Sequence, residues 1–245
     1  MRILALESSG KVASASLLKD NVLLSEFCID CGLVHSKTLA LIVQSLLDVT
    51  DFKLKDVDFL AVANGPGSFT GLTIGVSIIK GISLILNKPV IGVSTLYAMA
   101  QNAIMLENNL ICTAIDAKNG RFYSALFTVQ DGKLIRILED SAINVVDLFS
   151  KLLNYDNKSI VILGNGAEQL YDYINKNDVS KRLNVKIMNA EYRYQSSRGV
   201  AYAARDLILS KGNIITTSAD KLQINYLVFC QAERELGKKL ELKRS

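Results

Sequence analysis

The chain has no tryptophan, two prolines, four cysteines and a single histidine, His35, among its 245 residues. One histidine argues against a zinc peptidase, because HExxH-type sites need two histidines on one helix face. Four cysteines in a chain of this length give no disulfide framework like that of small secreted domains. Cys28 and Cys31 have the CxxC spacing, but no second pair completes a tetrahedral site. We therefore expect no bound metal and ordinary packing of these cysteines.

The chain also lacks a strong excess of charge. It carries 28 Lys and Arg against 24 Asp and Glu, a formal net charge of +4, and only the end, GKKLELKRS, concentrates basic residues. This balance does not by itself indicate a nucleic-acid binder. The longest apolar run, 72–86, is interrupted by Gly75, Lys80 and Gly81, and falls short of the roughly 18 residues of a membrane span. The opening MRILALESS enters a strand pattern at once, which indicates no signal peptide. We expect a cytoplasmic protein with no membrane partner.

The residues present are those of a globular α/β protein, 49% hydrophobic and 21% charged. Residues 3–24 and 111–135 follow the same plan. Each is an apolar strand that ends in a carboxylate (Glu7, Asp116), a short turn, a second strand of alternating small and apolar residues, a polar turn and a third strand. The repeat predicts two copies of one three-stranded antiparallel unit.

Alternating helices and strands follow each unit. In the first half the pattern predicts a helix at 36–49, a strand at 58–64, a helix at 70–86 and a strand at 89–94. In the second half it predicts a helix at 145–153, a strand at 159–164, a helix ending near 174, a strand at 184–188 and a helix at 194–209. We expect two α/β lobes, 1–104 and 105–245, with a last helix at about 226–240 that packs back on the first lobe.

The segments ILALESS, HSKTL, GPGSFTGL, GVSTL and IDAKNGRFY resemble the bacterial TsaB family, also called YeaZ, most closely over the first 125 residues. The resemblance implies the two-lobed fold of actin-like ATPases, which is ribonuclease H-like, with duplicated βββαβα lobes. It also implies a non-catalytic partner of the TsaD enzyme in making N6-threonylcarbamoyladenosine at position 37 of tRNAs that read ANN codons. The implied partners are TsaD, TsaE through the complex with TsaD, a second copy of the chain when it is alone, and tRNA indirectly or weakly.

Two alternatives stay open beside this reading. One is an ATP-dependent small-molecule kinase of the same superfamily, and the less favoured one is a glycoprotease-like metallopeptidase. The chain also departs from the family pattern at three places. Thr73 stands where arginine is usual, Arg121 lies in a stretch where glutamate is usual, and 225–228 lacks the usual proline and arginine. These departures put any anion-binding or tail contact of the family in doubt.

The turn GPGSFTG, residues 65–71, resembles a phosphate-binding loop but does not match either phosphate-binding motif. Leu72 follows the last glycine where a P-loop needs lysine, and the glycine spacing is one residue too long for a dinucleotide fingerprint. We expect a tight turn in which Ser68 or Thr70 caps the next helix, with anion binding by the helix amides as the alternative. Glu7 and Asp116 are expected to act as local caps. The vestigial nucleotide or anion site would comprise Glu7, Ser8, Gly65, Gly67, Ser68, Thr70 and Asp116. No cofactor is expected, although ATP or ADP could bind without turnover.

The helix at 72–86 is apolar around its whole circumference, so it must be covered on more than one face. One stripe contains Leu72, Val76, Ile79 and Ser83, and an offset stripe contains Ile74, Ile78, Ile82 and Ile85. Either stripe could face the partner. The resemblance implies pairing through helices of the first lobe. The predicted partner surface comprises Leu39, Ile42, Val43, Leu46, Leu72, Gly75, Val76, Ile79 and Ser83.

Overall fold

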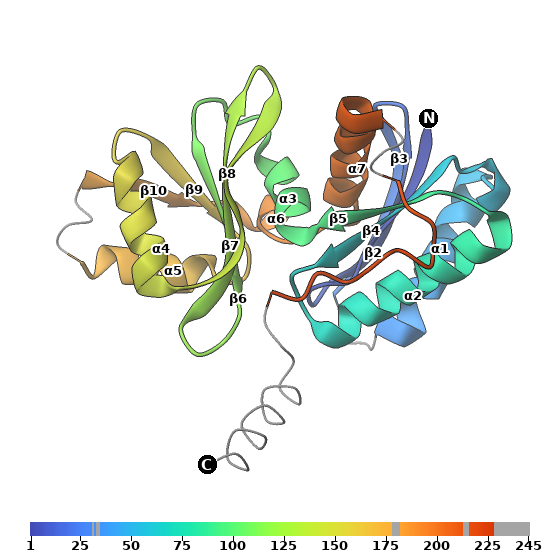
Figure 1. Cartoon of the computed structure of the whole chain (residues 1–245), viewed down its shortest axis with the longest axis horizontal. Coiled ribbons are helices and arrows are strands. Elements are labelled where there is room, and N and C mark those ends of the chain that lie inside the picture. The colour runs from blue at the N-terminus through green and yellow to red at the C-terminus, as the bar shows by residue number, and fades with distance from the viewer. Residues whose placement is uncertain (31, 33–34, 178–181, 213–215, 228–245) are drawn as a thin grey trace, which may run out of the picture.

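The computed structural model describes residues 1–30, 32, 35–177, 182–212 and 216–227 (Figure 1). The first sheet has the strand order β3-β2-β1-β4-β5, in which β1 to β3 are antiparallel and β4 and β5 run parallel to β1. Its strands are β1 (Arg2–Glu7), β2 (Ala13–Lys19), β3 (Val22–Ile29), β4 (Phe59–Gly65) and β5 (Val90–Ser94). On one face lie α1 (His35–Thr50) and α2 (Phe69–Leu86), and a short 3-10 turn, η1 (Leu54–Asp56), joins α1 to β4.

The second sheet repeats this order as β10-β9-β6-β7-β8. Its strands are β6 (Leu110–Asp116), β7 (Arg121–Gln130), β8 (Lys133–Asn144), β9 (Ser159–Leu163) and β10 (Asn184–Ile187). The helices around it are α3 (Thr95–Ala100), η2 (Gln101–Ala103), α4 (Val145–Leu152), η3 (Leu153–Tyr155), α5 (Ala167–Asn175) and α6 (Ala190–Arg193). The structure thus confirms the predicted fold, two α/β lobes that share the βββαβα plan.

The helix α7 (Ser197–Lys211) corrects one prediction. The sequence placed a helix at 194–209 in the second half, but α7 covers the open face of the first sheet (Figure 1). Its alanines pack against small residues of β1 and β4, which include Ala5 and Ala61. Its first turn is held by β2 and β3, because the Ser197 N–H donates to Ser14 Oγ at 2.9 Å and the Arg198 N–H donates to Glu26 Oε1 at 2.9 Å. The division at residue 104 stays a prediction, and the last helix expected at 226–240 lies outside the described residues except for 226 and 227.

An extended segment, residues 216–227, returns to the first lobe and lies beside α2 (Figure 1). We call it the C-terminal strap. Thr217 and Val90 exchange two backbone hydrogen bonds of 2.8 and 3.0 Å, which adds the strap to the edge of the first sheet. Farther along, the Asn225 N–H donates to the Asn64 carbonyl at 2.7 Å, and Leu222 is buried in the same core as α1 and α2.

Close packing explains the glycines of GPGSFTG. A Cβ at Gly71 would lie 2.0 Å from the Ser8 carbonyl oxygen, and the Ser8 hydroxyl donates to the Gly71 carbonyl at 2.9 Å. A Cβ at Gly67 would lie 2.6 Å from the Ser9 carbonyl oxygen, and one at Gly65 would lie 2.4 Å from the Asn225 carbonyl oxygen. The turn is therefore the place where the β1–β2 connection, the start of α2 and the strap meet.

Two alanine substitutions in α2 test this contact. Gly71→Ala should lower the free energy of unfolding by about 2 kcal/mol or more, because the added methyl group meets backbone that cannot move aside. Gly81→Ala is the matched control, since a Cβ there meets nothing within 4 Å, and it should stabilise the protein by about 0.5–1 kcal/mol. Urea unfolding measures both, and equal midpoints for the two variants would contradict the close approach.

Candidate functional site

A cleft of about 780 Å³ lies between the lobes, and Gly67, Ser68 and Asp116 of the predicted vestigial nucleotide or anion site line it. Its first-lobe wall is the β1–β2 connection and the N-cap of α2. Its second-lobe wall is the β6–β7 turn, the residues after β9 and the segment between α6 and α7. Three acidic and three basic side chains line it, namely Asp30, Asp116, Glu168, Lys11, Lys118 and Arg193. The cleft therefore offers no excess of positive charge to a polyphosphate.

Glu7, at the end of β1, is fully buried. Its Oε1 accepts the Ser9 N–H at 2.5 Å, and its Oε2 has no hydrogen-bond partner among the described residues. Burial raises the pKa of Glu7 to about 7, because a carboxylate loses its hydration there, and hydrogen bonds from Ser9 and Ser8 oppose only part of the shift. Glu7 thus caps the local turn, as the sequence predicted.

Asp116 holds the corresponding position in the second lobe. Its Oδ1 accepts the Lys118 N–H at 2.8 Å, its Oδ2 pairs with Lys118 Nζ at 3.1 Å, and its own N–H donates to Asn165 Oδ1. This carboxylate also stabilises its own turn. Both carboxylates therefore accept hydrogen bonds from amides of their own turns, Glu7 from Ser9 and Asp116 from Lys118.

The remaining residues of the predicted anion site have structural contacts. Ser68 caps α2, since its Oγ accepts the Gly71 N–H at 3.3 Å, which confirms the predicted cap, whereas Thr70 is exposed. His35, the first residue of α1, bonds the Gly10 carbonyl through Nε2 at 2.8 Å. Across the part of the chain that the structure describes, no three His, Cys, Asp or Glu side chains gather into a metal site. Cys31 lies outside that part, so the CxxC pair cannot be placed.

The predicted partner surface requires a correction. All nine of its residues are buried inside the first lobe, in α1 or in the inner stripe of α2: Leu39, Ile42, Val43, Leu46, Leu72, Gly75, Val76, Ile79 and Ser83. Six of them belong to the core that α1 and α2 form with the first sheet, and all nine are too buried to form the main contact with a partner. On α1 and α2 the sequence chose the residues that the lobe itself covers.

The side of α2 that points away from its inner stripe is exposed to solvent. Phe69, Leu84 and Ile85 are 53%, 73% and 83% exposed, and Ile74, Ile78 and Ile82 are half-buried between this side and the core. The neighbouring α1 exposes Leu41 and Val49. We call these exposed side chains of α1 and α2 the outward face. The sequence included Ile85 in its second stripe but missed Phe69, Leu84, Leu41 and Val49, whose exposure depends on how the helices are oriented on the sheet.

By length and composition alone, α2 could cross a membrane, which corrects the expectation that its apolar run is too short. It has 18 residues and a mean hydropathy of 1.8, and a third of it is buried inside the molecule. Its inner stripe forms part of the first core together with α1 and β4. That packing is the arrangement of a core helix in a globular lobe.

Two five-stranded lobes of this plan around a cleft define the actin-like, ribonuclease H-like class. Within it, residues 31–242 match the family described as "TsaD: tRNA N6-adenosine threonylcarbamoyltransferase". The chain is 30% identical over 164 residues to the tRNA threonylcarbamoyladenosine biosynthesis protein TsaB of Bacillus subtilis, covering 67% of this chain and 71% of that protein. It is 38% identical over 126 residues to TsaB of Escherichia coli, about half of each chain (51% and 54%). The chain belongs to the TsaB (YeaZ) family.

Solved structures agree on the fold. YeaZ from Pseudomonas aeruginosa superposes with a TM-score of 0.73 at 23% identity, covering 92% of this chain and 99% of that one. A second Pseudomonas aeruginosa protein, described as similar to peptidase YEAZ, gives a TM-score of 0.75 at 22% identity, covering 93% and 99%.

The buried Glu7 predicts a pH dependence of stability. Its folded pKa, about 7, lies above its ordinary value of 4.5, so the folded state holds the proton more tightly. Its contribution to stability is therefore complete below about pH 4.5 and is lost as pH rises through 7, by up to about 3 kcal/mol. Glu7→Gln carries no charge, so this variant should match the parent at pH 5 and melt at a higher temperature at pH 8.5.

Thermal unfolding at the two pH values checks this prediction. Glu139→Gln, at an exposed glutamate of β8, is the control and should follow the parent at both. A Glu7→Gln variant that loses as much stability as the parent between pH 5 and 8.5 would show that Glu7 does not cause the change.

Proposed function

We propose that this chain is a non-catalytic subunit that binds a TsaD-type transferase and supports synthesis of N6-threonylcarbamoyladenosine at position 37 of tRNAs that read ANN codons. Membership of the TsaB family supports the pathway. The observation that carries the proposal is the outward face, on which Phe69, Leu84 and Ile85 are exposed although the lobe has already filled its core. In this proposal the chain acts in the cytoplasm, and TsaE and tRNA meet it through the TsaD complex.

The outward face suits a helical partner. Large apolar side chains exposed on two neighbouring helices, here Leu41 and Val49 of α1 with Phe69, Leu84 and Ile85 of α2, favour a protein–protein contact. A face with no better partner pairs with its own copy about a two-fold axis. We therefore expect a homodimer of the isolated chain and exchange of that dimer for a heterodimer when TsaD is present.

The contacts in the cleft support the absence of catalysis by this chain. Glu7 is buried behind the β1–β2 turn, and Asp116 is paired with Lys118. Neither carboxylate is free to hold a metal ion or to orient water beside a phosphate. The chain would then contribute a docking surface, and the partner would catalyse the reaction.

One charge on the outward face tests the docking proposal. Ile85→Arg leaves the core intact and places an unpaired ion inside any contact through this face, so it should weaken TsaD binding and homodimer formation at least tenfold. The matched control is Leu209→Arg, at a 71% exposed leucine of α7 on the other face of the sheet, and it should change neither. Light scattering and titration calorimetry measure both. Unchanged binding by a folded Ile85→Arg variant would place the docking surface elsewhere.

An assay of ATP hydrolysis tests the proposal that this chain is not catalytic. The purified chain should hydrolyse ATP no faster than a buffer blank, because the cleft carboxylates are engaged within their own turns. A phosphate-release assay checks this. Turnover above about 1 s⁻¹, the low end of ordinary enzymes, that Asp116→Ala abolishes would contradict the proposal and favour a kinase.

A further inference from the structure

A second surface adjoins the outward face, at the first turn of α2. There the ring of Tyr226, from the C-terminal strap, stacks on Phe69 with centroids 5.2 Å apart and planes inclined by 21°. The two residues stay 45% and 53% exposed, so each ring covers only part of the other. Exposed aromatic side chains that hold a fixed position are the residues most often found at the energetic centre of protein contacts.

Beside the stack, a groove of about 430 Å³ runs between α2 and the strap. Its base includes the buried Val76 and Leu222, and its rim carries Thr73, Ser77 and Lys80 from α2 and Ile224 from the strap. Tyr226 lines the groove and stacks on Phe69, which belongs to the outward face, so the groove adjoins that face. A partner lying on the outward face would therefore also cover the groove.

Lys80 gives the groove its charge. It is the only charged residue in α2, and no ion pair holds it within the part of the chain that the structure describes. Lys80 lines the groove above the buried Val76 and Leu222, so its ammonium group would lose water when a partner covers the rim. A partner that binds here needs a carboxylate opposite Lys80.

The strap is fixed firmly enough to form half of a binding site. The Asn64 side chain donates to the Gln223 carbonyl at 3.1 Å, the Asn225 N–H donates back to the Asn64 carbonyl at 2.7 Å, and Leu222 is buried beneath. These bonds hold Tyr226 over Phe69 before any partner arrives. Pre-organised side chains lose little entropy on binding, so the contact is worth more than a mobile one.

We propose that the strap groove, lined by Lys80, Ile224 and Tyr226 and joined to the outward face through the Phe69–Tyr226 stack, is the second half of the docking surface. It takes a helix of the TsaD-type partner that places an apolar side chain on the Phe69–Tyr226 stack and a carboxylate against Lys80. The inference rests on the proposed docking function. It adds a specificity-determining contact from a segment 157 residues away from Phe69 in the chain.

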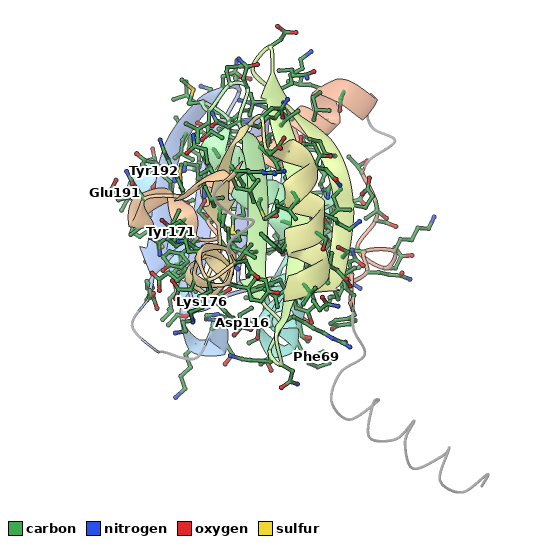
Figure 2. All side chains as sticks on the ribbon, turned by 90° about the vertical axis from the view of Figure 1, so that its left-hand side faces the viewer. Phe69, Asp116, Tyr171, Lys176, Glu191 and Tyr192 are labelled. Atoms are coloured by element: carbon green, nitrogen blue, oxygen red, sulfur yellow. The ribbon has the colours of Figure 1, made fainter. Side chains whose placement is uncertain are left out.

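Two substitutions test the groove independently. Tyr226→Ala should weaken binding of purified TsaD at least tenfold, and Tyr226→Phe should retain it, because the ring carries the contact. Lys80→Glu should weaken binding by a similar factor, because it opposes the partner's carboxylate, and it leaves the strap untouched. The matched control is Tyr192→Ala, at a 43% exposed tyrosine that Figure 2 shows far from Phe69 in projection, and it should bind like the parent.

Titration calorimetry measures TsaD binding by these variants and by Ile85→Arg. The comparison distinguishes failure of the groove from failure of the proposed function. Loss of binding by Tyr226→Ala and Lys80→Glu with normal Tyr192→Ala supports the groove. Binding within twofold of the parent for both groove variants, when Ile85→Arg abolishes it, overturns the groove and leaves the outward face. Loss of the homodimer alone, with TsaD binding kept, also overturns it, because the occupant would be a second copy. If no variant changes binding, the docking function itself fails.

Discussion

The rest of the first lobe depends on the contact between the Ser8 carbonyl and the first turn of α2. Because the helix starts against backbone, its position and rotation on the sheet are fixed at that end. That rotation turns Leu72, Val76 and Ile79 into the core and leaves Ile85 in solvent. The same turn leaves room at Gly65 for the strap, so one set of glycines positions both the outward face and the groove beside it.

The same region shows a second use for a glycine-rich turn that resembles a phosphate-binding loop, which is close packing of the chain against itself. In a P-loop the glycines let backbone amides surround a ligand, whereas here they let the chain approach itself. The Ser68 N–H donates to the Ser9 carbonyl, and the Ser9 N–H donates to Glu7. These two amides thus form bonds within the chain. A turn can therefore resemble a phosphate-binding motif while its backbone hydrogen bonds serve packing within the chain.

The sequence predicted what is decided locally. The antiparallel units around Glu7 and Asp116, both strand–helix alternations and the Ser68 cap follow from turn chemistry and periodicity within about 20 residues. The position of α7 could not be predicted in this way, because it depends on Ser14 and Glu26, more than 170 residues away in the chain. The sequence also could not show which stripe of α2 faces the sheet. Both stripes are apolar, and the choice depends on contacts distant in the chain, such as the approach of Gly71 to Ser8.

Because the two lobes share one plan, the second lobe can be compared with the first. The second lobe also packs its glycine turn against its first strand, since a Cβ at Gly164 would lie 2.1 Å from the carbonyl oxygen of Ala114 in β6. There, however, the exposed side of α5 carries Glu168, Gln169 and Asp172, the polar outer face expected of a helix in water. The fold therefore does not require an apolar outer face on the helix that follows this turn. Because α2 has one in the same architectural position, its exposed leucine and isoleucine need a cause outside the lobe, and a partner that covers them is the cause that hydrophobic burial favours.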